Sequence, residues 1–218
     1  MIQSKNGIQI PTTLAEWCDP ERTALIVYDM QVGICAQVSG AKEIIKRSAT
    51  VLDAARTVGM RVAFTRHLSL PLRWMGMTQL RTAMAWQRRK DPDAIEPRFL
   101  PDAEATKIVP ELAPLAGEAV FDKLTMSIFD STSLILALHD CGIRSIAIVG
   151  IAMEIGIEPT VRQATDNGFV AVLIEDACGF GNEAARDRAM ATLSFIGEAV
   201  VTDAAGFCRA VARAGTQA

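Results

Sequence analysis

Residues 145–151 read SIAIVGI, a short run rich in apolar and β-branched residues of the kind that forms a buried strand. Five similar runs lie at 24–29, 61–66, 118–123, 169–176 and 198–203. Segments of helical period separate these runs, and such an alternation is typical of a parallel sheet between two layers of helices. The sequence therefore predicts an α/β fold, a doubly wound, six-stranded and mostly parallel sheet with helices on both faces.

Two of the intervening segments show how the helices should begin and end. In 130–142, apolar residues fall on one face, and we expect Asp130 or Ser131 to cap the start. In 181–196 the apolar stripe follows Asn182, which is the expected cap.

The composition favours one globular domain, residues 1–218, because 50% of the residues are hydrophobic and 22% are charged. The formal net charge of -3 argues against nucleic-acid and membrane-surface partners, which require an extended basic face. A small-molecule substrate fits this charge better.

The five cysteines are odd in number and contain no CxxC pair, so we expect reduced thiols without a disulfide framework. The opening residues show no basic-then-apolar leader and no apolar stretch long enough for a membrane span, so we expect a cytoplasmic protein.

Residues 68–101 are too long for an ordinary connection and show no strand alternation. Between 66 and 98 there are seven Lys or Arg residues against three acids, and the segment holds Trp74 and Trp86. One interpretation is a lid in which these tryptophans and Arg88 bind an anionic, planar substrate. The other is an arm that packs against a second subunit.

Two charged residues stand at the carboxyl ends of predicted strands. Asp29 ends the run at 24–29, where burial would suit it to general acid or base catalysis, although an Asp there is also a common turn residue. Lys123 ends the run at 118–123, where it would hold Asp29 ionised and polarise a substrate oxygen, although it could equally be a surface lysine.

The run at 145–151 leads into a third candidate, because Pro159 is tolerated only in the first turn of a helix. Gly156 therefore lies at an elbow between a strand and a helix, where free N–H groups can bind an anion or a developing oxyanion. The alternative is that Gly156 only permits a tight turn or close packing.

Three motifs together resemble the isochorismatase-like superfamily of hydrolases over nearly the whole chain, from Thr23 to Asp203. They are ALIVYDMQ (24–31), FDKLTMSIFDSTSL (121–134), and VGIAMEIGIEPTVRQATDNGF (149–169), the last followed by VLIEDACG (172–179). The resemblance implies that Asp29 is the general acid or base and that Lys123 completes the site. It also implies a cysteine nucleophile at the elbow, and here Gly156 stands in that place. Isochorismatases proper are similar in carrying glycine there, and they cleave a vinyl ether.

The resemblance extends the expected site. The backbone of Ala152, Met153 and Gly156 should bind a substrate oxygen, and the peptide between Ala152 and Met153 should be cis. We assign substrate binding to Gln31 and Phe129, and also to Glu154, which could instead complement the helix dipole or act as a base for water.

No metal and no cofactor are expected, because His67 and His139 are the only histidines and a single imidazole is a poor zinc site. We expect His139 to be solvated. The resemblance also implies a homodimer or a homotetramer.

The sequence thus favours a hydrolase of a small, anionic substrate that acts through Asp29 and Lys123 without a covalent cysteine intermediate, on a vinyl ether or a similar acid-labile bond. One alternative is hydrolysis of an amide or imine by activated water. The other is a binding or scaffold homologue that has lost catalysis.

Overall fold

A six-stranded sheet forms the centre of the computed structural model, which describes residues 1–214. Its spatial order is β5-β4-β3-β6-β7-β8, and all five neighbouring pairs are parallel. The strands are β3 (Thr23–Tyr28), β4 (Arg61–His67), β5 (Ala119–Lys123), β6 (Ser145–Ile151), β7 (Val170–Gly179) and β8 (Ala199–Thr202). The predicted α/β fold is confirmed.

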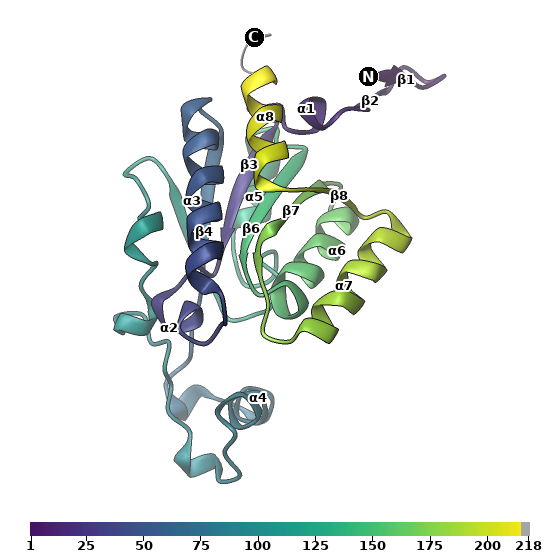
Figure 1. The fold of residues 1–218 in the computed structure, drawn as a ribbon. Helices are drawn as coiled ribbons and strands as arrows, with labels where there is room; N and C mark the ends of the chain where they lie inside the picture. Colours follow the sequence, from purple (N-terminus) through teal and green to yellow (C-terminus); the bar gives the residue numbers. More distant parts are fainter. Residues whose placement is uncertain (215–218) are drawn as a thin grey trace.

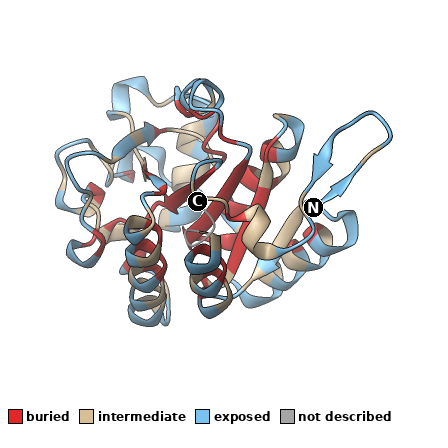
Figure 2. Ribbon diagram, turned by 90° about the horizontal axis from the view of Figure 1, so that it is seen from above, coloured by how far each residue is buried: buried red, intermediate tan, exposed pale blue. Residues whose placement is uncertain are grey.

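Helices cover both faces of this sheet (Figure 1). α3 (Ala41–Thr57) and α8 (Ala204–Ala214) pack on one face, and their apolar side chains share a core cluster with one set of strand residues. α5 (Leu134–Asp140), α6 (Glu158–Asp166) and α7 (Glu183–Ile196) supply the cluster on the other face. Figure 2 shows the resulting layers, with buried strands between helices whose outer sides are exposed. The central strand β3 is buried along its whole length, as the apolar run predicted.

The chain order reverses direction across the sheet between β3 and β6, which makes this pair the topological switch point where α/β proteins bind ligands. The two strands approach closely at Gly150, where an added Cβ would overlap the backbone of Tyr28. The φ of Gly150 is +132°, a value that glycine adopts readily and other residues rarely do. The carboxyl ends of β3, β4 and β5 meet at this edge and carry Asp29, His67 and Lys123.

The two predicted helix caps have different outcomes. Asn182 caps α7, because its side chain accepts a hydrogen bond from the Ala185 N–H at 2.9 Å. The other prediction is wrong: α5 begins at Leu134, with Ser133 at the cap position, and neither Asp130 nor Ser131 caps it. The reason is local, since Ser131 has a φ of +59° and so interrupts right-handed helical backbone before α5 can start.

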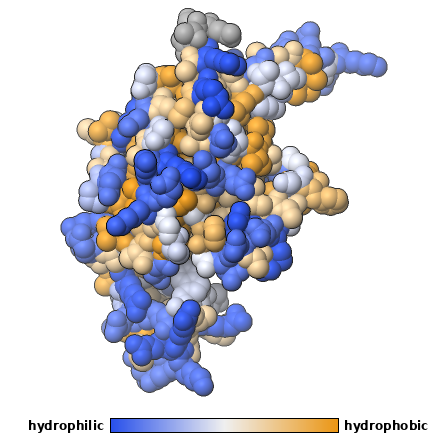
Figure 3. Space-filling model, viewed as in Figure 1, coloured by the Kyte–Doolittle hydropathy of each residue, from blue (hydrophilic) through white to orange (hydrophobic). Residues whose placement is uncertain are grey.

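The long segment after β4 forms a helix of its own, α4 (Met77–Gln87), which projects from the body of the molecule (Figure 1). The surface around it is largely hydrophilic in the view of Figure 3, in keeping with the arginines of this segment. The remaining named elements are a hairpin of β1 (Ile2–Gln3) and β2 (Gln9–Ile10), α1 (Leu14–Trp17), α2 (Val32–Cys35), 3-10 turns at Leu72–Trp74, Pro92–Ala94, Glu104–Thr106 and Pro110–Leu112, and a π-helical turn at Met153–Ile157. Within residues 1–214, no helix has the length and apolar character that a membrane crossing would need.

Candidate active site

Asp29 follows β3 directly and holds its carboxylate in a buried, fully hydrogen-bonded position. Its φ of +46° is uncommon for a residue other than glycine, and aspartate tolerates it better than most. The Thr65 hydroxyl donates to Asp29 Oδ1 at 2.6 Å, and Lys123 Nζ donates to Oδ2 at 2.7 Å. The side chain is only 5% exposed. The carboxylate is therefore fixed by one neutral donor from β4 and one cationic donor from β5.

Lys123 lies behind this carboxylate. Its side chain is fully buried, and its three N–H donors go to Asp29, to the Tyr28 hydroxyl at 2.9 Å and to the Thr125 carbonyl at 3.0 Å. Burial lowers the pKa of Lys123, and the Asp29 carboxylate opposes that shift. With every donor used, Lys123 positions Asp29 and has no N–H left for a substrate, contrary to the predicted polarising role.

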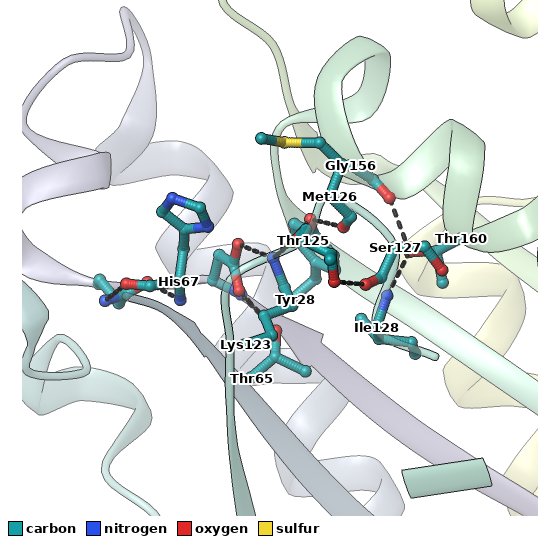
Figure 4. A network of polar contacts seen from close by, with 12 residues as sticks. Tyr28, Thr65, His67, Lys123, Thr125, Met126, Ser127, Ile128, Gly156 and Thr160 are labelled. Atoms are coloured by element: carbon teal, nitrogen blue, oxygen red, sulfur yellow. Dashed lines mark hydrogen bonds and ion pairs between the residues drawn. The ribbon is translucent and has the colours of Figure 1, made fainter. Parts of the chain in front are cut away.

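Tyr28 is the last residue of β3 and joins the same network (Figure 4). Its ring lies under Lys123 Nζ, which is 4.4 Å from the ring centroid, and its hydroxyl donates to the Met126 carbonyl in a short hydrogen bond. Burial and the neighbouring Asp29 carboxylate raise the pKa of Tyr28 well above its ordinary value. The sequence reasoning gave this residue no role, since within an apolar strand it resembles any buried aromatic residue.

A cavity of about 520 Å³ opens in front of this network, which is within the usual size range for small-molecule sites. Tyr28 and Asp29 form part of its floor, while Lys123 is not among its lining residues. One face of α4 closes the opposite side, through Thr78, Gln79, Thr82, Ala83, Trp86 and Gln87. The lid interpretation of this segment therefore agrees with the geometry.

His67 also lines the cavity, between Asp29 and the lid. Its ring packs edge-on against Trp86 and Phe99, at centroid distances of 5.8 and 6.2 Å. Burial lowers the pKa of His67 to about 4, so the imidazole is neutral at pH 7. Neither ring nitrogen has a hydrogen-bond partner among the described residues, which leaves both available to a ligand.

The family is shown by comparison with known proteins. The isochorismatase domain matches residues 23–205, which is most of the chain. This protein belongs to the isochorismatase family.

Among its relatives, a ureidoacrylate amidohydrolase RutB of Agrobacterium fabrum is 28% identical over 179 residues, covering 72% of this chain and 76% of that protein. An isochorismatase family protein from Burkholderia thailandensis is similar in structure, with a TM-score of 0.70, 25% identity, and coverage of 88% of this chain and 96% of that one. A cysteine hydrolase from Pseudomonas syringae pv. phaseolicola has a TM-score of 0.75, 24% identity, and coverage of 89% and 94%. Family membership and the amidohydrolase relative together support a hydrolase.

The cysteines of this isochorismatase-family chain lie away from the cavity, since none of the five is among its lining residues. Burial raises the pKa of Cys18 to about 12 and that of Cys35 to about 11. Burial also raises the pKa of Cys178, which hydrogen-bonds to the Ile148 carbonyl. These thiols are protonated at neutral pH and unsuited to nucleophilic attack.

The elbow after β6 differs from the prediction. Gly156 and Met153 are buried and do not line the cavity, whereas Ala152 does. The Gly156 N–H donates to the Ala152 carbonyl at 3.1 Å, so it is not a free donor for an oxyanion. The cis peptide lies between Ile151 and Ala152, one residue before the expected position.

Three residues assigned to substrate binding have other partners. Gln31 is fully buried, and its amide joins the backbone of His67 and Thr106 through three hydrogen bonds. Phe129 stacks on Phe169 in the core, at 5.8 Å between centroids. Glu154 Oε1 accepts from the N–H groups of Gly181 and Asn182, so this carboxylate fixes the loop before α7. The structure brings none of the three to the cavity wall.

Of the three residues predicted to bind substrate from the segment 68–101, one lines the cavity and two do not. Trp86 lines the cavity, whereas Trp74 is 74% exposed and does not, and Arg88 ends α4 on the outside. The cavity's cation is instead Arg98, an exposed side chain with no ion pair to the described residues.

Among residues 1–214, no group of three or more His, Cys, Asp or Glu side chains is arranged to hold a metal ion. His139 is exposed as expected, although its ring stacks on Phe169.

Proposed function

We propose that this protein is a hydrolase of a small, anionic substrate in which Asp29 is the acid–base group and no cysteine takes part. The observation that carries the proposal is the placement of Asp29, which lines the cavity while Thr65 and Lys123 hold both of its carboxylate oxygens. A carboxylate fixed in this way is ready to exchange a proton with a bound molecule. A scaffold homologue would have no need for an open cavity at a buried ion pair, which weighs against that alternative.

The buried pair offers a route for a proton. Lys123 Nζ is 2.7 Å from Asp29 Oδ2, and burial lowers the pKa of Lys123, so its proton is released more readily than from a solvated lysine. Asp29 would pass this proton to the enol carbon of a vinyl ether. Water then adds to the oxocarbenium carbon and returns one proton to Asp29, which leaves a hemiketal. The carbon–oxygen bond to the leaving group then breaks, and the hemiketal hydroxyl proton passes to the leaving oxygen, so that a ketone and an alcohol are released.

Hydrolysis of an amide is the second candidate, and the relative named as a ureidoacrylate amidohydrolase favours it. In that reaction the ionised Asp29 would remove a proton from water, and the resulting hydroxide would attack the amide carbon directly. As the carbon–nitrogen bond of the tetrahedral intermediate breaks, Asp29 would give this proton to the leaving nitrogen. Without a thiol among the cavity residues, no thioester would form.

An anionic substrate is supported by Arg98, the cation on the cavity wall that has no ion-pair partner within residues 1–214. Trp86 on the lid supplies an apolar surface for a planar ring. The rest of the wall is mainly apolar, from Ile34, Val38, Leu68, Met75, Leu124 and Ile151. This combination fits a compact molecule with one acidic end.

The test is to incubate the purified protein with isochorismate and, separately, with ureidoacrylate, and to identify the products by mass spectrometry. Asp29→Asn should reduce turnover of the accepted compound by about 100-fold or more, since general acid–base catalysis contributes roughly 10²–10⁴-fold. Thr57→Ala is a suitable control for handling, because the exposed Thr57 hydroxyl donates to the Asp53 carbonyl within α3 and Thr57 does not line the cavity. Unchanged turnover in Asp29→Asn would exclude the proposed role of this carboxylate.

A further inference from the structure

The space in front of Gly156 is filled by another residue. An ideal Cβ added to Gly156 would overlap the hydroxyl oxygen and Cζ of Tyr28 and would lie 2.9 Å from its Cε1. The φ of Gly156 is outside the left-handed region, so its backbone could accept any residue. The glycine is therefore required by the tyrosine that faces it and not by the turn.

Tyr28 also separates Gly156 from the ligand cavity. Tyr28 lines the cavity and Gly156 does not, and in Figure 4 the phenol lies between Lys123 on one side and Met126 and Gly156 on the other. The hydroxyl accepts from Lys123 Nζ at 2.9 Å and donates to the carbonyl of Met126. Met126 itself lines the cavity, so this hydrogen bond joins two residues of the cavity wall.

We propose that Tyr28 is a catalytic residue whose hydroxyl takes the place of a side chain at position 156 and donates a hydrogen bond to a substrate oxygen at this wall. The proposal rests on the proposed function, because it names the group that meets the substrate beside Asp29. It also explains why Gly156 and Tyr28 occur together in this chain.

The chemistry of the hydroxyl follows from its neighbours. Burial and the Asp29 carboxylate keep the phenol protonated, so it can donate a hydrogen bond but cannot act as a nucleophile. The ammonium of Lys123 donates to the phenol oxygen, and such a chain polarises the O–H bond and strengthens its donation. The leaving oxygen of a vinyl ether gains negative charge as its bond to carbon breaks, and the carbonyl oxygen of an amide gains it when hydroxide attacks. Such an oxygen would attract this hydrogen away from the Met126 carbonyl. No covalent bond to the protein forms at any point.

The first experiment tests the occupied space through thermal stability. Gly156→Ala should lower the melting temperature by about 5 °C in the natural background, since overpacking a core of this size has an effect of that order. In a Tyr28→Val background the same change should lower it by less than half as much, because the phenol is gone. An equal loss in both backgrounds would show that Tyr28 does not fill the space in front of Gly156.

The second experiment tests the catalytic role with isochorismate or ureidoacrylate, whichever the natural protein turns over. Tyr28→Phe keeps the ring and removes the hydroxyl, and it should lower kcat by about 10²-fold with KM changed by less than about 2-fold, as for loss of one oxyanion donor. The control is Thr160→Val, which removes a buried hydroxyl bonded to the Gly156 carbonyl at 2.7 Å, on a residue outside the cavity lining. This control should lower the melting temperature and leave kcat within about 2-fold, since lost hydrogen bonds affect mainly stability there.

The outcomes separate the two proposals. If Asp29→Asn abolishes turnover while Tyr28→Phe leaves kcat unchanged, the role of Tyr28 is wrong and the proposed function stands. An equal fall of kcat in Tyr28→Phe and Thr160→Val would show a structural role only, which also overturns the inference. If neither compound is turned over by the natural protein, the proposed function fails together with the catalytic role of Tyr28, while the stability comparison still decides what fills the space.

Discussion

Replacement of Lys123 by methionine should destabilise the protein strongly, because its ammonium is the one cation paired with Asp29 within residues 1–214. Lys123 Nζ makes three hydrogen bonds of 2.7 to 3.0 Å, and its side chain is fully buried. Methionine fills a similar volume but leaves the Asp29 carboxylate, 5% exposed, with the Thr65 hydroxyl as its remaining side-chain donor. Removing one partner of a buried ion pair costs about 3–5 kcal/mol of unfolding free energy. For a chain of this size that corresponds to a fall of roughly 6–20 °C in melting temperature.

The double variant separates the charge from the packing. In Lys123→Met with Asp29→Asn, both charges are absent, so the unpaired carboxylate that penalises Lys123→Met is no longer present. We expect the double variant to be more stable than Lys123→Met alone by about 1–2 kcal/mol, since replacing both partners of a buried pair is often close to neutral. Urea denaturation followed by circular dichroism at pH 7 measures all four proteins. Losses that add to within about 0.5 kcal/mol would refute the reasoning, because residues that do not interact behave additively.

Three further predictions concern the surroundings of this pair. Because burial lowers the pKa of His67 to about 4, the unfolded chain binds a proton between pH 6.5 and 4 that the folded chain does not. The free energy of unfolding should therefore fall as the pH drops through this window, by at most about 1.4 kcal/mol per pH unit. In urea titrations at several pH values, His67→Gln should show a weaker dependence of this free energy on pH. Gln31→Ala, which removes three hydrogen bonds between a buried side chain and the backbone, should lose about 2–4 kcal/mol of unfolding free energy. Gln37→Ala on the surface should change the urea midpoint little. Trp86→Ala should raise KM about 10-fold for the accepted substrate, on the order of the free energy of a buried aromatic contact, while Trp74→Ala outside the cavity should leave it unchanged in the same steady-state assay.

The sheet and the pairing of Asp29 with Lys123 could be predicted because both depend on regular geometry. Apolar runs of strand length alternating with helical segments leave few arrangements other than a parallel sheet, and parallel strands bring their carboxyl ends to one edge. Two charged residues that end strands of such a sheet can therefore be placed near the same edge from the sequence alone. A special role for residues 68–101 was predicted for a related reason, since a connection of this length rarely serves only to join two strands. The sequence left open whether the segment is a lid or an arm that packs against a second subunit.

The predictions that were wrong concern what each side chain contacts across the fold. Gln31 follows Asp29 by two residues, and sequence position alone suggests that both face a ligand. In the structure the amide of Gln31 turns instead toward the backbone of His67 and Thr106, where it pairs with two carbonyls and one N–H group. The start of α5 was misplaced for a comparable reason, since the φ of Ser131 follows from its local contacts and not from helical periodicity.

Tyr28 and Gly156 show why the role of a glycine cannot be inferred from the motif that contains it alone. In the sequence the two residues are far apart, and the glycine reads as the loss of a nucleophile while the tyrosine reads as part of an apolar strand. In the structure they form one unit, because the phenol occupies the volume that any side chain at 156 would need. Introducing a cysteine by Gly156→Cys alone should therefore destabilise the protein without creating a reactive thiol. Gly156→Cys combined with Tyr28→Val should give a thiol that iodoacetamide labels more rapidly than the same thiol in the single variant, as measured by peptide mass spectrometry. Equally rapid labelling of position 156 in the single variant would mean that the phenol moves aside at little cost. The side chains that positions 28 and 156 can accept would then not depend on each other.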